Sequence, residues 1–224
     1  MVKIKVIFFD IDNTLLNHSG SENKALKSIY KKYFLHMSYK KFKSVWQKWS
    51  KENWTLYELK QLTFEQQRSK RIIDTWKEFG KSISIKEANH IFNIYLSFYE
   101  LNWQSFPHVL STLKKLYKKG LMLGIITNGN KNQQINKLKS LNLYPFFNPQ
   151  LIVVSEETKY SKPAKEIFLH AQSLTSVSPN EIMMIGDSII QDIEGGQKVG
   201  WNTLLVDHFN QQPIKSFRLL NTLL

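Results

Sequence analysis

The chain of 224 residues is long enough for one large domain, or for a core with a smaller appendage, and its 42% hydrophobic content suits a buried interior. The absence of cysteine excludes disulfides and thiolate metal sites, and no apolar stretch is long enough to cross a bilayer. We therefore expect a cytoplasmic protein without a membrane partner.

The formal net charge of +13 raises the question of a polyanionic partner. Only three of the 31 basic residues are arginine, however, and arginine is the side chain that grips phosphate groups in a bidentate fashion. We interpret the charge as a lysine-rich solvated surface that attracts anionic substrates, and we do not expect a nucleic-acid partner.

Five short apolar or β-rich runs are predicted to be strands, and helical patterns lie between the last four of them. The strands are residues 3–9, 121–126, 151–154, 182–185 and 203–206, and the helices are residues 109–119, 132–141, 164–173 and 189–199. This alternation predicts an α/β fold with a Rossmann-like parallel sheet and helices on both faces, which binds ligands where the strands end.

The first predicted strand is followed at once by Asp10, Asp12 and Thr14. At a strand end, one carboxylate can attack phosphorus, while a second can protonate the leaving alcohol and later activate water. The two roles require opposite protonation states, which the crowding of like charges beside a cation can supply. Such a pair also occurs in ordinary turns and helix caps, so this motif alone leaves both interpretations open.

Residues 17–106 interrupt the alternation, because they contain no convincing strand and have apolar residues at helical spacing. We assign residues 1–16 and 107–224 to the α/β core domain and residues 17–106 to an inserted all-helical domain.

The insert holds 16 basic and 8 acidic residues and five of the six tryptophans. A stacking surface for single-stranded nucleic acid is one interpretation. We favour a small tryptophan-containing core with lysines facing water, and we treat His18 as a bystander.

The next two strand ends carry further polar groups. Thr127 and Asn128 offer a hydroxyl and an amide that can hold phosphoryl oxygens without adding charge, although the tripeptide ending in Gly129 also suits an ordinary turn. Lys162 stands before Pro163, which suits the first position of a helix. A lysine held there can offset the negative charge of a nucleophile and a phosphoryl group.

The fourth predicted strand is followed by Asp187 and Asp192. Ser188 and Gln191 fit a capping box, which would place Asp187 at the strand end and Asp192 in the first turns of the helix. With Asp10, these acids would form the oxygen-rich site that Mg²⁺ prefers. The alternative is that both acids only stabilise the start of the helix.

These four motifs, in this order and each at a strand end, closely resemble those of the haloacid dehalogenase superfamily. The resemblance covers residues 1–16 and about 107–206. It implies that Asp10 is the nucleophile and a Mg²⁺ ligand, and that Asp12 is the acid/base, with a backbone carbonyl that also binds the metal. It further implies a direct metal ligand in Asp187, supporting roles for Asp192 and Thr14, and a phosphoryl site formed by Thr127, Asn128 and the catalytic Lys162.

The insert resembles the helical cap of the group that includes β-phosphoglucomutase, nucleotidases and N-acylneuraminate-9-phosphatase, and residues 127–134 and 153–157 resemble the last two. This implies a magnesium-dependent phosphatase that hydrolyses small phosphorylated metabolites, such as a nucleoside monophosphate or a sugar phosphate, through an aspartyl-phosphate. Dehalogenation is not expected, because the dehalogenases lack an acid at the place of Asp12. A phosphonatase, a phosphomutase and a non-catalytic protein that binds nucleic acid or an acidic partner remain alternatives. We expect a monomer or a homodimer.

Overall fold

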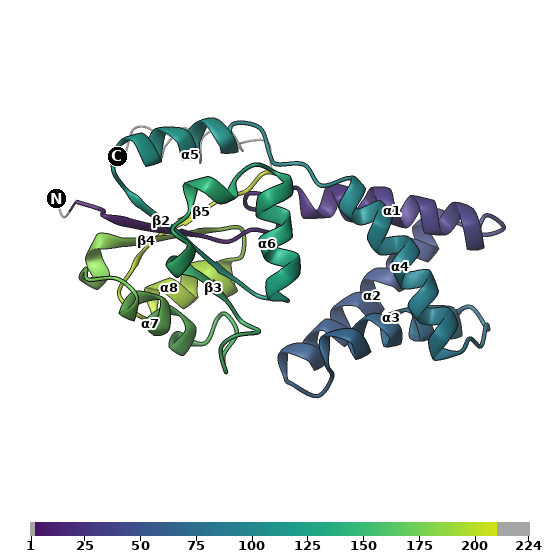
Figure 1. The fold of residues 1–224 in the computed structure, drawn as a ribbon. Coiled ribbons are helices and arrows are strands. Elements are labelled where there is room, and N and C mark those ends of the chain that lie inside the picture. The colour runs from purple at the N-terminus through teal and green to yellow at the C-terminus, as the bar shows by residue number, and fades with distance from the viewer. Residues whose placement is uncertain (1–2, 210–224) are drawn as a thin grey trace. The chain divides into compact units, whose positions relative to one another are not determined.

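The computed structural model describes residues 3–209, and Figure 1 shows their elements. The described chain divides into two compact units. The α/β unit contains the residues up to His18 and those from Trp103 onward, and the helical unit is Ser19–Asn102. Our assignment of residues 1–16 and 107–224 to a core domain and 17–106 to an insert stays a proposal, and its residues 1–2 and 210–224 lie outside the described residues. No helix in the described range is long and apolar enough to span a membrane.

A five-stranded parallel sheet forms the centre of the α/β unit, as predicted, with the order β3-β2-β1-β4-β5. The strand β1 therefore lies between β2 and β4, and the order reverses beside it, which is where parallel sheets bind ligands. The strands are β1 Val6–Phe9, β2 Met122–Thr127, β3 Ile152–Val154, β4 Ile182–Gly186 and β5 Asn202–Leu205.

Helices cover both faces of this sheet (Figure 1). Successive side chains of a strand point to opposite faces. Ile7 and Phe9 thus join the hydrophobic cluster that includes Leu113 of α5, whereas Phe8 joins the cluster that includes Phe168 of α7 and stacks on Trp201 at 5.3 Å between ring centroids. The helices are α5 Val109–Lys118, α6 Lys131–Ser140, α7 Lys165–Ser173 and α8 Gly195–Gln197, with 3₁₀ turns at Tyr144–Phe146, Pro149–Leu151 and Pro179–Glu181.

The predicted helix over residues 189–199 differs from the observed structure. The chain there forms a π-helix, η4 Ile189–Glu194, followed by the short α8. Its wider turn is visible in the hydrogen bond from the Ile193 amide to the Ser188 carbonyl, five residues earlier. The two glycines that follow pack closely: a Cβ on Gly195 would lie 2.6 Å from the Phe168 ring, and one on Gly196 would lie 3.0 Å from Thr203.

The helical unit consists of four helices and contains no strand. Capping boxes begin two of them, with Thr63 and Gln66 at α3 and Ser84 and Glu87 at α4. An aromatic core fills the unit and includes the buried Trp46 and Trp76, as the interpretation favoured from the sequence requires. Trp49 and Trp54 are only partly buried, and Trp103 packs in the α/β unit instead. The helices are α1 His18–Tyr33, α2 Tyr39–Glu58, α3 Phe64–Glu78 and α4 Ile85–Leu101.

Candidate active site

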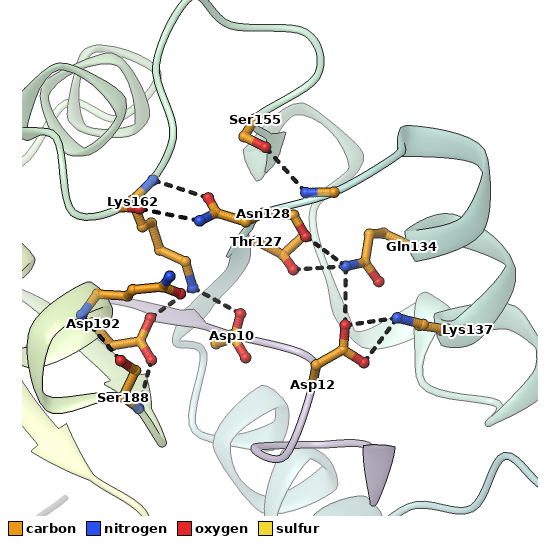
Figure 2. Close-up of polar contacts among 12 residues, drawn as sticks. Asp10, Asp12, Thr127, Asn128, Gln134, Lys137, Ser155, Lys162, Ser188 and Asp192 are labelled. Atoms are coloured by element: carbon orange, nitrogen blue, oxygen red, sulfur yellow. Dashed lines mark hydrogen bonds and ion pairs between the residues drawn. The ribbon is translucent and has the colours of Figure 1, made fainter. Parts of the chain in front are cut away.

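Polar residues from neighbouring strands meet at the carboxyl edge of the sheet (Figure 2). Phe9 is level with Ile125 of β2 and with Ile185 of β4, so the residues that follow these positions leave the sheet side by side. The Asp10 amide donates to the Ile185 carbonyl at 2.9 Å, which holds the start of the first motif against β4. All the predicted site residues belong to the α/β unit.

Lys162 forms the centre of a buried ion-pair network. Its Nζ lies 2.7 Å from Oδ1 of Asp10 and 2.6 Å from Oδ1 of Asp192, and all three residues are less than a tenth exposed. Burial alone would lower the pKa of Lys162, but the two carboxylates raise it above its usual value. The lysine therefore stays charged and partly neutralises the acids beside it.

Asp10, Asp187 and Asp192 form an acidic cluster whose ligand atoms all lie within 4.8 Å of one another. Burial raises the pKa of Asp10 to about 7 and that of Asp187 to about 6, and repulsion between the carboxylates adds to both shifts. Because a bound cation would relieve both effects, this oxygen-rich cluster fits a divalent metal ion. It contains Asp192 but not the Asp12 carboxylate. The resemblance assigns the metal the Asp12 backbone carbonyl instead, and that contact stays a prediction.

The Gly186-Asp187 step at the end of β4 leaves room for the Asp192 side chain. A Cβ on Gly186 would lie 2.2 Å from the Asp192 carboxyl carbon, so no larger residue fits without movement. The predicted cap is half present: Ser188 Oγ accepts from the Gln191 amide at 3.1 Å. The Ser188 amide donates to Asp192 at 3.0 Å instead of to the Gln191 side chain. Asp192 therefore fixes both the helix start and Lys162.

The end of β2 is tied to the loop that carries Lys162. Asn128 accepts from the Lys162 amide at 2.9 Å and donates to the Lys162 carbonyl at 3.1 Å. The Gly129 amide donates to the buried Ser155 hydroxyl at 3.0 Å. Thr127 is buried, and its hydroxyl accepts from Gln134 at 3.0 Å. The structure thus gives Asn128 a positioning task, and its predicted contact with a phosphoryl group stays a prediction.

Asp12 contacts a group of residues that the sequence analysis did not select. Lys137 Nζ lies 2.8 Å and 2.6 Å from the two Asp12 carboxylate oxygens, Gln134 donates at 3.3 Å, and His18 Nδ1 lies at 3.5 Å. Burial alone would raise the pKa of Asp12, but Lys137 and His18 hold it well below its usual range. Gln134 and Lys137 lie on one face of the predicted helix that follows Thr127, and this spacing was the available signal.

Thr14 belongs to the backbone turn that follows Asp12. It is fully buried, and within residues 3–209 its hydroxyl has no hydrogen-bond partner. The turn is closed by the Asn13 amide, which donates to the Leu16 carbonyl, and by the Thr14 carbonyl, which contacts His208 at 3.0 Å. The predicted supporting role of Thr14 therefore stays a prediction.

Known proteins with similar sequences cover nearly the whole chain. The relatives include glyceraldehyde 3-phosphate phosphatase of Pyrococcus furiosus, 30% identical over 91% of this chain and 81% of the relative. Pyrimidine 5'-nucleotidase PynA of Streptococcus pneumoniae is 26% identical, over 93% and 89% of the two chains. N-acylneuraminate-9-phosphatase of Rattus norvegicus is 28% identical, over 88% and 80%.

The fold is also found among solved structures. The magnesium-bound HAD-hydrolase YfnB of Bacillus subtilis superposes with a TM-score of 0.82, at 24% identity, over 98% of this chain and 99% of that one. Residues 7–206 match the family model of the haloacid dehalogenase-like hydrolases, which confirms the resemblance given by the four motifs. The chain belongs to the haloacid dehalogenase-like hydrolases.

Proposed function

We propose that the protein is a phosphomonoesterase that uses Asp10 as a nucleophile. The observation that carries this proposal is the pair Asp10 and Asp12, two carboxylates at one strand end whose side chains are held by different lysines. Lys162 lies against the nucleophile, where it can offset the charge of an incoming phosphoryl group. Asp12 is free of that lysine and can serve as the acid and base.

In the first half of the reaction an Asp10 oxygen attacks phosphorus, and the bond between phosphorus and the ester oxygen breaks. Lys137 and His18 keep Asp12 ionised in the absence of substrate, so Asp12 takes up its proton when the negative charge of the phosphoryl group arrives beside it. It gives this proton to the ester oxygen, and an alcohol leaves. In the second half Asp12 takes a proton from water, and the water oxygen attacks the phosphorus of the aspartyl-phosphate. Inorganic phosphate leaves, and Asp10 and protonated Asp12 are regenerated.

Asp10 and Asp187, together with the backbone carbonyl of Asp12, are the residues that would hold Mg²⁺, and Asp192 supports them from the same acidic cluster. The bound ion supplies a positive charge for the phosphoryl oxygens and favours the ionised form of the acids around it. Thr127 and Lys162 are proposed to contact the phosphoryl group. Lys162 lies 2.7 Å from the nucleophile, and the buried Thr127 ends the neighbouring strand. The names of the relatives support a small phosphorylated metabolite as the substrate class.

The test is a phosphate-release screen with Mg²⁺ or with a chelator over nucleoside monophosphates, sugar phosphates and N-acylneuraminate 9-phosphate. We expect release to require Mg²⁺, and we expect Asp10→Asn to lower kcat by at least about 1,000-fold because it removes the nucleophile. Glu194→Gln is the matched control, since it removes an exposed charge from the same π-helix that carries Asp192, outside the acidic cluster.

Near-normal release by the folded Asp10→Asn variant would contradict the nucleophile assignment. A product in which the phosphoryl group has moved to another position of the substrate, without release of phosphate, would indicate a phosphomutase instead.

A further inference from the structure

The carboxylate of Asp12 forms an ion pair with a buried lysine. Lys137, on α6, contacts both carboxylate oxygens (Figure 2). Its side chain is only 3% exposed, whereas the Asp12 side chain is 29% exposed. An ammonium group is costly to bury unless an opposite charge meets it. The lysine is therefore fixed by the surrounding protein, while one side of the carboxylate stays open to solvent and ligands.

Gln134 extends this contact along the same face of α6. It lies three residues before Lys137, and positions with this spacing are neighbours on a helix surface. Its Nε2 lies 3.3 Å from Asp12 Oδ2, 3.0 Å from Thr127 Oγ1 and 2.9 Å from the Asn128 carbonyl. An amide nitrogen has two hydrogens for these three acceptors, so Gln134 links Asp12 to the end of β2.

The two carboxylates of the first motif are thus positioned by separate parts of the fold. Lys162, in the loop before α7, binds Asp10 and Asp192. Lys137 binds Asp12, which lies outside the acidic cluster. Apart from His18, whose Nδ1 lies 3.5 Å from the carboxylate, the side chains that orient Asp12 come from α6 and not from the acidic cluster.

We propose that Lys137, assisted by Gln134, is a positioning residue that holds the Asp12 carboxylate where it exchanges protons with the oxygen atoms of the phosphoryl-transfer steps. The inference rests on the proposed phosphatase function, and it adds a residue pair from α6 to the four motifs. Such a role demands a fixed geometry, because proton transfer falls off steeply when the donor is misplaced.

The test compares two aryl esters of similar shape, phenyl phosphate and 4-nitrophenyl phosphate, in the wild type and in Lys137→Met. The value of kcat/KM reports the transfer to Asp10, and nitrophenolate leaves with little need of a proton. We expect a loss of roughly 100-fold for phenyl phosphate and of less than about 5-fold for the nitrophenyl ester. Lys137→Arg should recover part of the phenyl phosphate rate, and the exposed Lys139→Met on the same helix should leave both rates unchanged.

A double-mutant cycle distinguishes a loss of activity that acts through Asp12 from a loss caused by a disturbed fold. Because Lys137 acts through Asp12, adding Lys137→Met to Asp12→Asn should cost no further activity on phenyl phosphate. If Lys137→Met does not fold, Gln134→Leu takes its place in both comparisons, since it removes a neutral donor and leaves the ion pair intact. Equal losses on the two esters, or a further loss in the Asp12→Asn background, would overturn the inference. Absence of hydrolysis by the wild type would instead contradict the proposed function.

Discussion

Asp10 and Asp12 lie two positions apart in the sequence, yet their surroundings shift the pKa of each in opposite directions. Asp10 is buried among other acids, which raises its pKa to about 7, whereas two basic side chains hold the pKa of Asp12 below its usual range. The motif predicts two carboxylates at a strand end. The partner Lys137 could not be chosen from sequence, because it is one of 28 lysines and its burial depends on how α6 packs.

Stability without metal should depend on pH in a direction set by Asp10 and Asp187. Their pKa values rise on folding from 3.8 to about 7 and about 6, so the metal-free folded protein binds protons that the unfolded chain has released. This stabilisation is complete below about pH 4 and is lost as the pH rises through about 7. Asp12 stabilises the folded protein by a constant amount above about pH 5 and adds no pH dependence there, because its lowered pKa leaves it ionised in both states.

We therefore expect the melting temperature in chelator to fall between about pH 5 and pH 8, and Mg²⁺ to raise it more at pH 8. Differential scanning fluorimetry measures both effects. Asp10→Asn should flatten the dependence in chelator. A melting temperature that climbs over this pH range in the metal-free wild type would contradict the assignment.

At the scale of elements, the five strands were predictable because buried parallel strands have continuous apolar sequences. Their order in the sheet comes from the structure. Their ends carry Asp10, Thr127 and Asp187, and the register brings these ends together. The π-helix after Asp187 was not predictable. Apolar spacing over so few residues does not distinguish its wider turn, which depends on the Ser188 carbonyl accepting from two successive amides.

Replacing Gly195 by alanine tests the packing between α8 and α7. Helix propensity and steric contact change the free energy of unfolding in opposite directions at this position. Its backbone is helical, so propensity alone predicts that Gly195→Ala stabilises the protein by about 1 kcal/mol. The added methyl group would meet the Phe168 ring at 2.6 Å, and we expect a net destabilisation of about 1–3 kcal/mol in urea unfolding.

The variant Phe168→Leu removes the ring, so Gly195→Ala should destabilise the protein less in this background than in the wild type. A double-mutant cycle measures this difference. A net gain in the free energy of unfolding from Gly195→Ala alone would show that the packing between α7 and α8 is looser than described.

For the whole molecule, the notable features are the division into two compact units and the excess of basic charge. Both units are basic in sequence, with a net charge of +8 over residues 17–106 and +5 over the remainder. Lys40, Lys41, Lys48 and Lys51 of the helical unit are exposed, whereas its Trp46 and Trp76 are buried. This arrangement favours a diffuse field around the molecule over a surface for stacking bases.

We expect this field to steer anionic substrates, so kcat/KM should fall several-fold between about 20 mM and 500 mM sodium chloride while kcat stays nearly constant. Steady-state kinetics on a substrate from the screen measures both quantities. Potassium glutamate in place of chloride controls for weak binding of chloride to the phosphoryl site. Steep salt-dependent binding of a single-stranded oligonucleotide, without phosphate release, would favour the rival binding protein.

The stacking of Trp201 on Phe8 has a practical consequence for following the two units separately. Trp201 lies in the core of the α/β unit, where its indole nitrogen donates to Gln172 at 3.1 Å, and Trp46 lies in the core of the helical unit. Each indole therefore has its own apolar surroundings and changes its emission when its own unit opens. Subtracting the fluorescence of a Trp201→Phe variant from that of the wild type isolates an intrinsic optical signal from the central sheet, without any attached dye.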